Sequence, residues 1–188
     1  SWELAHAKEL AGSAEKRLKQ LPKWEKIKAQ AESPENYISG KGVDHFHRYK
    51  EDFDILEKLG INAFRFTIEW SRLEPEQGAW DQAAIDHYHN YIAELKKRGI
   101  EPILNIWHWT HPVWFEEKGA FAKTGNIGYF LRFVTKLAEE FGNDLKYVIT
   151  INEPNIYISY REVSGTGVSV PPDYSLIRRL LMYFRLIK

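Results

Sequence analysis

The sequence has no cysteine, no excess of either charge and no long apolar run. Without cysteine, disulfide frameworks, thiolate zinc sites and iron–sulfur clusters are excluded. The 26 Lys and Arg residues balance the 26 Asp and Glu residues, which argues against nucleic-acid and membrane partners. No apolar stretch approaches the roughly 18–20 residues of a membrane span, and we expect no signal peptide. We therefore expect a cytoplasmic protein.

Length and apolar content are sufficient for a packed core. Hydrophobic residues make up 44% and aromatic residues 14% of the 188 residues, which rules out a disordered or fibrous protein. The length suits one ordinary domain of about 100–200 residues. It is short for a closed eight-stranded α/β barrel, which typically needs about 250.

The first part of the chain is predicted to be helical. Helix formers with apolar residues at a 3.6-residue period run over 2–21, and after Pro22 the pattern resumes over 24–31. Turn formers follow over 32–42. We therefore predict an N-terminal helical segment and loop at 1–42, with a second unit over 43–188.

One pattern then occurs three times: a helix, a glycine and a β-rich segment. Helices are expected at 44–59, 82–98 and 126–141, glycines at Gly60, Gly99 and Gly142, and strands within 61–70, 100–109 and 145–154. The glycines suit the left-handed residue that ends a helix, and Asp81 suits an N-cap. This alternation predicts parallel strands with surrounding helices.

The strand segment 64–70 has two different faces. Phe64, Phe66 and Ile68 alternate with Arg65, Thr67 and Glu69. A parallel strand buried between two helix layers is normally apolar on both faces. The polar face therefore favours the inside of a barrel mouth over an open doubly wound sheet.

Glu153 is the sharpest chemical feature. It directly follows an apolar strand, at the edge of a parallel sheet where ligands bind. Burial there would favour the protonated form needed for general-acid work. The alternative is a carboxylate that caps the next helix or pairs with a lysine.

Aromatic residues surround His108. Trp107 and Trp109 flank it, and Trp70 and Trp114 are expected at the same edge. Aromatic faces beside polar donors suit a sugar ring, although a lone histidine is more often buried and bonded to a carbonyl. The clustered tryptophans favour a carbohydrate site.

Three further sets of residues have competing interpretations. Arg65 either holds a carboxylate in the site or forms an internal salt bridge to Glu69. The histidine pairs in 44–47 and 87–89 are spaced i,i+2, so they point to different helix faces and do not predict a metal site. The basic segment 176–187 is expected to be an outer helix of the same α/β layer.

Four motifs together resemble one known family. They are Asp44-His45-Phe46-His47-Arg48-Tyr49-Lys50-Glu51-Asp52, Arg65-Phe66-Thr67-Ile68-Glu69-Trp70-Ser71-Arg72, His108-Trp109 and Thr150-Ile151-Asn152-Glu153-Pro154-Asn155. In this order and spacing they resemble the β-glucosidases of glycoside hydrolase family 1. The resemblance implies an α/β fold, a partial (β/α)8 TIM barrel with about three to four parallel strands. It also implies retaining hydrolysis of a β-glycoside or oligosaccharide by two carboxylates, without cofactor or metal.

The same resemblance implies roles for five residues. Glu153 corresponds to the catalytic acid/base, and Asn152 to the residue that binds the sugar 2-hydroxyl. His108 corresponds to a second ligand of sugar hydroxyls, with Trp109 beside it. Arg65 corresponds to the arginine that positions the nucleophile, whereas Glu69 has a structural place in the family.

Several family features are missing from this sequence. They are the first strand with its sugar-binding glutamine, the Thr-Glu-Asn-Gly segment that carries the nucleophile, and the tryptophan-bearing loops of the eighth strand. The loop 161–174 also diverges. We therefore expect a fragment that is inactive alone and is completed by a complementary C-terminal barrel fragment or by self-association, since open sheet edges invite pairing.

Two alternatives remain open. One is a stable, non-catalytic half-barrel scaffold or carbohydrate-binding fragment. The other is inverting chemistry by Glu153 with Glu69 as the second acid, which requires a carboxyl separation of about 6.5–9.5 Å.

Overall fold

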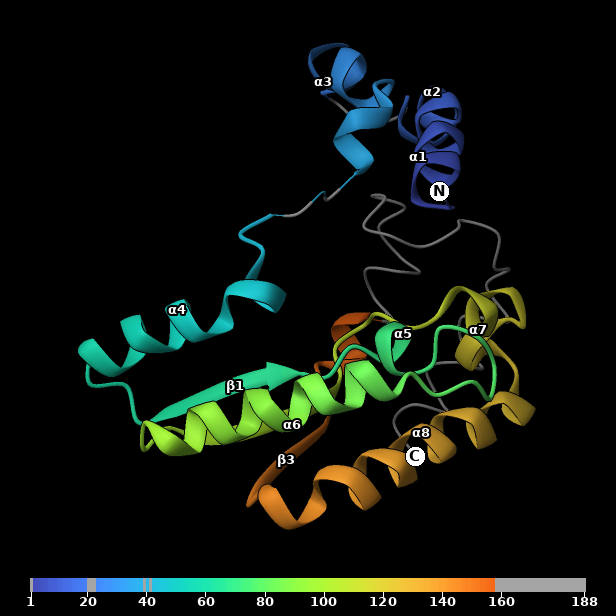
Figure 1. Ribbon diagram of the computed structural model, residues 1–188. Helices are drawn as coiled ribbons and strands as arrows, with labels where there is room; N and C mark the ends of the chain where they lie inside the picture. The colour runs from blue at the N-terminus through green and yellow to red at the C-terminus, as the bar shows by residue number, and fades with distance from the viewer. Residues whose placement is uncertain (1, 20–22, 39, 41, 158–188) are drawn as a thin grey trace.

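Three parallel strands form one sheet in the order β1-β2-β3 (Figure 1). The computed structural model describes residues 2–19, 23–38, 40 and 42–157. The strands are β1 (Ala63–Thr67), β2 (Glu101–Trp107) and β3 (Tyr147–Ile151). The predicted parallel alternation is confirmed. Each strand is shorter than its predicted segment, because the residues at the segment ends belong to the connecting loops or to the next helix.

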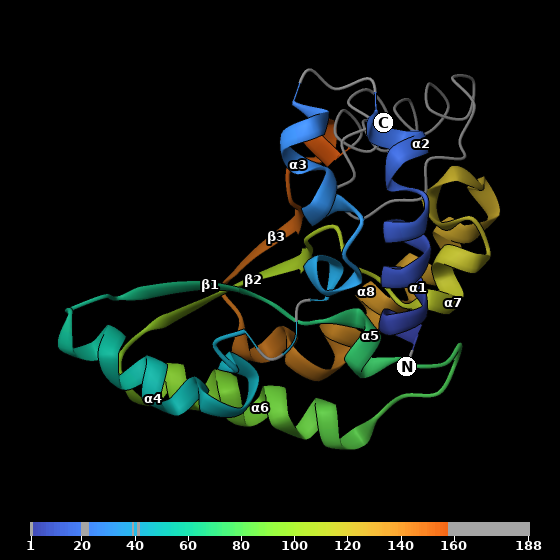
Figure 2. The same cartoon turned by 90° about the horizontal axis from the view of Figure 1, so that it is seen from above.

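Three long helices alternate with the strands. They are α4 (His45–Lys58), α6 (Gln82–Lys97) and α8 (Ile127–Phe141). Figures 1 and 2 show α4 beside α6, and α8 on the β3 side. Asp81 begins α6 as predicted, because its carboxylate accepts a hydrogen bond from the Ala84 amide at 3.1 Å.

Short helices occupy the loops that connect these elements. They are α5 (Trp70–Leu73), α7 (Val113–Glu117), η2 (Ala120–Ala122), η3 (Thr124–Asn126) and η4 (Gly142–Asp144). Gly60 and Gly99 have φ values of 70° and 69°, so the predicted left-handed ends of α4 and α6 are confirmed. The same prediction is wrong for Gly142. Its φ of −59° continues the helical turn into η4, so the chain needs no left-handed residue there.

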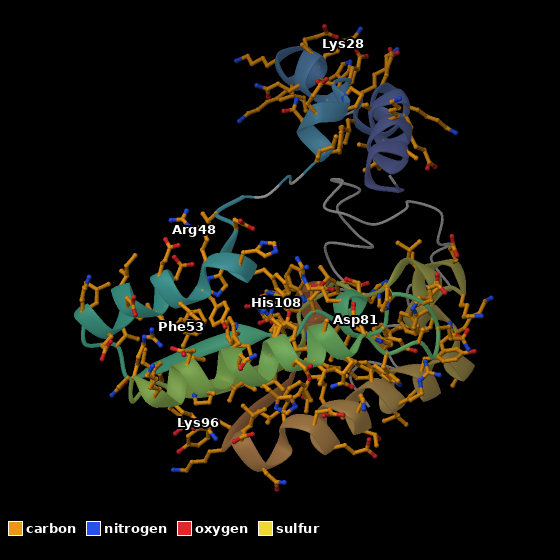
Figure 3. The ribbon with its side chains drawn as sticks, in the orientation of Figure 1. Lys28, Arg48, Phe53, Asp81, Lys96 and His108 are labelled. Carbon is orange, nitrogen blue, oxygen red and sulfur yellow. The ribbon has the colours of Figure 1, made fainter. Side chains whose placement is uncertain are left out.

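The apolar face of the sheet packs against the helices. Phe66 and Leu104 are buried, and the Phe66 ring lies 5.0 Å from the ring of Tyr91 on α6. Tyr91 in turn meets Phe53 of α4 edge-on at 4.8 Å. Phe53 lies between its helix and the sheet in Figure 3. The predicted alternation of β1 is therefore confirmed, with its phenylalanines facing the helix layer.

The other face of the sheet is polar at its centre. Arg65 and Thr67 pair in register with Ile103 and Asn105, so the four side chains share this face. Asn105 is fully buried and donates a hydrogen bond to the Thr67 hydroxyl at 3.3 Å. Arg65 is exposed. The polar face predicted from the sequence is therefore present.

The N-terminal segment consists of short helices. They are α1 (Trp2–Gly12), α2 (Ala14–Leu18), α3 (Trp24–Ala31) and the 3-10 helix η1 (Pro34–Tyr37). The prediction of one helix over 2–21 is wrong, because the chain turns at Ser13, whose hydroxyl bonds the Leu10 carbonyl at 3.3 Å. Ala11 and Trp24 are buried but lie outside the main core cluster. The boundary at 42/43 stays a prediction.

Two sequence predictions concern other parts of the chain. The expected helix at 176–187 and the loop 161–174 lie outside the described residues. Within the part of the chain that the structure describes, no helix has the length and apolar character of a membrane span.

The histidines of α4 and α6 bond to residues of the helix layer. His45 lies between the Asp52 carboxylate at 2.6 Å and the Tyr91 hydroxyl at 2.8 Å. His47 contacts the Asp44 carboxylate, also at 2.6 Å. These contacts join α4 to α6 and to the loop before α4.

His87 differs because it is stacked on an aromatic ring. Its ring lies 3.8 Å from that of Phe46, at an interplanar angle of 22°, and its buried Nε2 has no hydrogen-bond partner. Burial lowers the pKa of His87, and the positive charge of Arg72 lowers it further. The imidazole is therefore held neutral.

We expect this histidine to make stability depend on pH. The pKa of His87 is lower in the folded state than in the unfolded state, where it is about 6.5. The contribution of His87 to the free energy of unfolding is therefore complete above about pH 6.5 and is lost as the pH falls through the pKa of the folded state. The urea concentration at the unfolding midpoint should fall between pH 7.5 and pH 5.5 in the wild-type chain, and it should fall less in His87→Phe. The exposed His108→Gln is the control, and an unchanged pH dependence in His87→Phe would contradict the prediction.

Candidate active site

The ends of β2 and β3 bring His108 and Asn152 to one edge of the sheet. Trp107 and Ile151 are paired, so the next residue on each strand begins the adjoining loops. The Asn152 amide donates a hydrogen bond to the Trp107 carbonyl at 2.9 Å, which extends the ladder by one residue. Figure 3 places His108 at the end of the sheet to which the strand arrows point. The predicted common edge is confirmed.

Arg65 of β1 reaches Asn152, which follows β3 on the far side of the central strand β2. Its guanidinium donates a hydrogen bond to the Asn152 side-chain oxygen Oδ1, across 87 positions of sequence. Such a bond is strengthened by the positive charge of the donor. Asn152 is only 9% exposed. Two of the predicted site residues, from β1 and from the end of β3, are therefore in direct contact.

Trp109 contacts the backbone of the same asparagine. Its indole Nε1–H donates a hydrogen bond to the Asn152 carbonyl at 2.7 Å, and its ring meets His108 edge-on at 5.6 Å. Trp109 has a φ of 76°, in the left-handed region that residues other than glycine rarely adopt. His108, Trp109 and Asn152 therefore form one contiguous group.

Glu153 projects from this group into solvent. It is exposed and has a φ of 39°, which is also left-handed. Its carbonyl accepts a hydrogen bond from the Tyr157 amide at 3.0 Å, which begins a helical turn. The burial expected at Glu153 is therefore wrong for the described residues, because no described element covers its side chain.

Glu69 joins the loops that follow β1 and β2. One carboxylate oxygen accepts from the Ser71 hydroxyl at 3.0 Å and the other from the Thr110 hydroxyl at 2.7 Å. Within the described ranges no ion pair connects Arg65 to Glu69, so an internal salt bridge between them is not formed. Both Glu69 oxygens are used within the protein.

Trp70 is part of the core. It is 1% exposed, and its ring stacks on Phe133 with 4.8 Å between centroids. Trp114 is partly buried, and its indole donates to the Glu74 carbonyl at 3.0 Å. The prediction that Trp70 belongs to a carbohydrate surface is therefore wrong, because α8 covers its ring.

Glu74 is a buried carboxylate that sequence reasoning missed. It is fully buried and accepts hydrogen bonds from the Trp70 indole at 2.8 Å, from the Gly78 amide at 2.6 Å and from Arg132. Trp70 and Gly78 each lie four residues away, which was the only signal in the sequence. Glu74 therefore anchors the loop after β1 to α5 and α8.

Together these features define a segment of a parallel β/α barrel with a polar site at the carboxyl ends of its strands. The family model for glycosyl hydrolase family 1 matches residues 6–182. This chain belongs to glycosyl hydrolase family 1.

Several relatives of this chain are named β-glucosidases. β-Glucosidase A of Thermotoga maritima is 41% identical over 112 residues, which cover 59% of this chain and 25% of the relative. β-Glucosidase 14 of Arabidopsis thaliana is 38% identical over 126 residues, which cover 65% of this chain and 26% of the relative. The chain spans about a quarter of the length of these relatives.

Solved structures show the same fold. A β-glucosidase from Thermotoga maritima in complex with deoxynojirimycin aligns with a TM-score of 0.71 at 34% identity, over 77% of this chain and 32% of that chain. A β-glycosidase from Pyrococcus horikoshii aligns with a TM-score of 0.71 at 33% identity, over 77% and 33% of the two chains. The predicted partial TIM barrel is confirmed.

We expect Glu74→Ala to be strongly destabilising. The substitution leaves the Trp70 and Gly78 donors without an acceptor and removes the partner of Arg132, so unfolding should become easier by about 3–5 kcal/mol. Urea denaturation measures this change. Glu76→Ala, at an exposed position of the same loop, is the matched control and should shift stability by less than about 0.5 kcal/mol. Equal effects of the two substitutions would rule out an anchoring role for Glu74.

Proposed function

We propose that this chain is a part of a retaining β-glycosidase and that Glu153 is its acid/base. The contact between Arg65 and Asn152, directly before Glu153, carries this proposal. It joins two residues that the family resemblance assigns to one site, and the third, Glu153, follows Asn152 in the chain. The β-glucosidase names of the relatives support the substrate class, a β-glycoside or oligosaccharide.

The direction of the Asn152 side chain supports its proposed role. An arginine guanidinium only donates hydrogen bonds, so the oxygen of the Asn152 amide must face Arg65. The Nδ2 hydrogens then point away from Arg65 and remain as donors for a ligand. Asn152 therefore donates to the sugar 2-hydroxyl, and His108, exposed beside it, binds a neighbouring hydroxyl.

Glu153 has the exposure that its reaction needs. In the first step it protonates the glycosidic oxygen, and in the second it removes a proton from water. A nucleophilic carboxylate about 5–5.5 Å away is also needed, and the sequence contains no Thr-Glu-Asn-Gly segment to provide it. Arg65 would help to position that carboxylate. The described part of the chain is therefore inactive alone.

The open edges of the sheet support completion by another barrel segment. β1 and β3 pair only with β2 among the described strands. On β3, Tyr147 is 49% exposed and Val148 is 50% exposed, on opposite faces of the strand. Near β1, Leu59 and Ile61 are exposed as well. A complementary C-terminal barrel fragment would cover both sides of β3.

Self-association is the second way to cover these edges. Pairing β3 of one copy with β1 of the next is a head-to-tail contact, which leaves new open edges unless a ring closes. Eight strands are not a multiple of the three described strands. A complementary fragment is therefore the better fit to a closed barrel.

A half-barrel scaffold or carbohydrate-binding fragment remains the second candidate function. The cytoplasmic location and the inverting alternative stay predictions.

We expect no hydrolysis of 4-nitrophenyl β-glucoside by the pure chain. In a hybrid where this chain replaces the matching segment of Thermotoga maritima β-glucosidase A, we expect hydrolysis. Glu153→Ala in the hybrid should then lower kcat/KM by about 10²–10⁴-fold, because the leaving oxygen is no longer protonated. A 2,4-dinitrophenyl leaving group needs little protonation, so the loss in its first step should be smaller.

Glu76→Gln in the same hybrid is the control and should keep full activity. Turnover by the pure chain that Glu153→Gln abolishes would disprove the need for a second segment. Equal losses for the two leaving groups in the hybrid would disprove the acid/base role.

We expect the pure chain to associate through β3. Light scattering after size exclusion should give a mass above that of the 22.1 kDa chain, and Val148→Lys should shift it toward the monomer. Ala93→Lys, at an exposed position of α6, is the matched control. A strictly monomeric chain at all concentrations would disprove association through open edges.

A further inference from the structure

The indole of Trp109 has a protein acceptor. Its Nε1–H donates to the Asn152 carbonyl at 2.7 Å, so this donor is not free for a sugar hydroxyl. The acceptor belongs to the peptide group that connects Asn152 to Glu153. A residue assigned to substrate binding by resemblance therefore holds the backbone directly before the proposed acid/base.

Further hydrogen bonds hold the chain on both sides of this Asn152–Glu153 peptide group. The backbone N–H of Asn152 donates to the Trp107 carbonyl, and the backbone carbonyl of Asn152 accepts from the Trp109 indole. The side-chain oxygen of Asn152 accepts from Arg65. Beyond it, the Tyr157 amide donates to the Glu153 carbonyl at 3.0 Å. The backbone around Glu153 is therefore held from β1, β2 and the turn that follows β3.

Glu153 needs such support because its conformation is unfavourable. At a φ of 39°, a residue with a side chain is held in a sparsely populated region at a cost of about 1–3 kcal/mol. The orientation of the preceding carbonyl and the φ of Glu153 change together, because both describe rotation of one planar peptide group. The Trp109 bond opposes that rotation, and φ sets the direction in which the carboxyl-bearing side chain leaves the backbone.

We propose that Trp109 is a positioning residue for Glu153. Its indole N–H holds the Asn152 carbonyl, which keeps Glu153 in the left-handed conformation and so sets the direction in which its carboxyl-bearing side chain leaves the backbone. The inference rests on the proposed acid/base role of Glu153 for its functional meaning. Trp109 itself has a left-handed φ of 76°, and its indole lies within 2.7 Å of that carbonyl.

The chain contains a matched control for this bond. Trp114 is also partly buried, and its indole also donates to a backbone carbonyl, that of Glu74, at 3.0 Å. Trp109→Phe and Trp114→Phe therefore each remove one indole-to-carbonyl hydrogen bond and keep an aromatic ring. Only the first bond lies beside Glu153.

The test is NMR of the isotope-labelled chain without any sugar. A residue at positive φ shows a strong NOE between its own amide and Hα protons, because the two atoms lie close together. Trp109→Phe should weaken this NOE at Glu153 and speed exchange of the Tyr157 amide proton roughly two- to tenfold, the equivalent of one lost hydrogen bond. Trp114→Phe should leave both signals unchanged.

Unchanged signals in Trp109→Phe, or equal changes in Trp114→Phe, would overturn the proposal. If Trp109→Phe does not fold, the wild-type chain decides: its Trp109 indole proton should exchange at least tenfold more slowly than an exposed indole, and fast exchange overturns the proposal. No readout uses a substrate. The NMR signals therefore test the positioning role of Trp109 alone. The proposed acid/base role of Glu153 is tested separately, by the hybrid enzyme.

Discussion

The parallel register of β1, β2 and β3 is the constraint on which the site depends. Thr67 pairs with Asn105, and Asn105 pairs with Ile149, so the three strands end at a common edge. A shift of one residue would turn Arg65 toward the helices and Phe66 toward the polar face. The helix layer prevents that shift, because the partly buried Phe64 packs against α4 and the buried Phe66 against α6. Burial of one face thus determines what the other face presents.

Tryptophan indoles connect the loops at this edge to one another and to the end of β3. Trp70 donates to the Glu74 carboxylate, Trp114 to the Glu74 carbonyl and Trp109 to the Asn152 carbonyl. A partly buried indole combines a large apolar surface with one donor, which suits it to join a loop to a core. In this chain the indoles of the strand-end loops thus bond to the protein itself, whereas His108 and Asn152 are the residues proposed to contact a ligand.

Much of the architecture was predictable because it is written in local patterns. Periodicity predicted the three helix–strand units, and Asp81 predicted the start of α6. Gly142 misled because a glycine can also take ordinary helical angles, as it does at φ −59°. Trp70 misled because its strand position indicated a surface edge, whereas burial under α8 depends on contacts far away in sequence. Glu74 was missed for the same reason, since its partner Arg132 lies 58 positions away.

The sequence by itself determined the alternation of helices and strands, the polar face of β1 and, through its motifs, the family and the residues at the strand ends. These features depend on local periodicity and on residue type. Only the tertiary structure decided that Arg65 contacts Asn152 and not Glu69, that Trp109 uses its indole on the Asn152 carbonyl, and that Glu153 is exposed and left-handed. Those facts depend on how segments that are distant in the sequence approach one another. Hydrogen-bond partners across a sheet are determined by distance and direction in space, and a linear residue pattern contains neither.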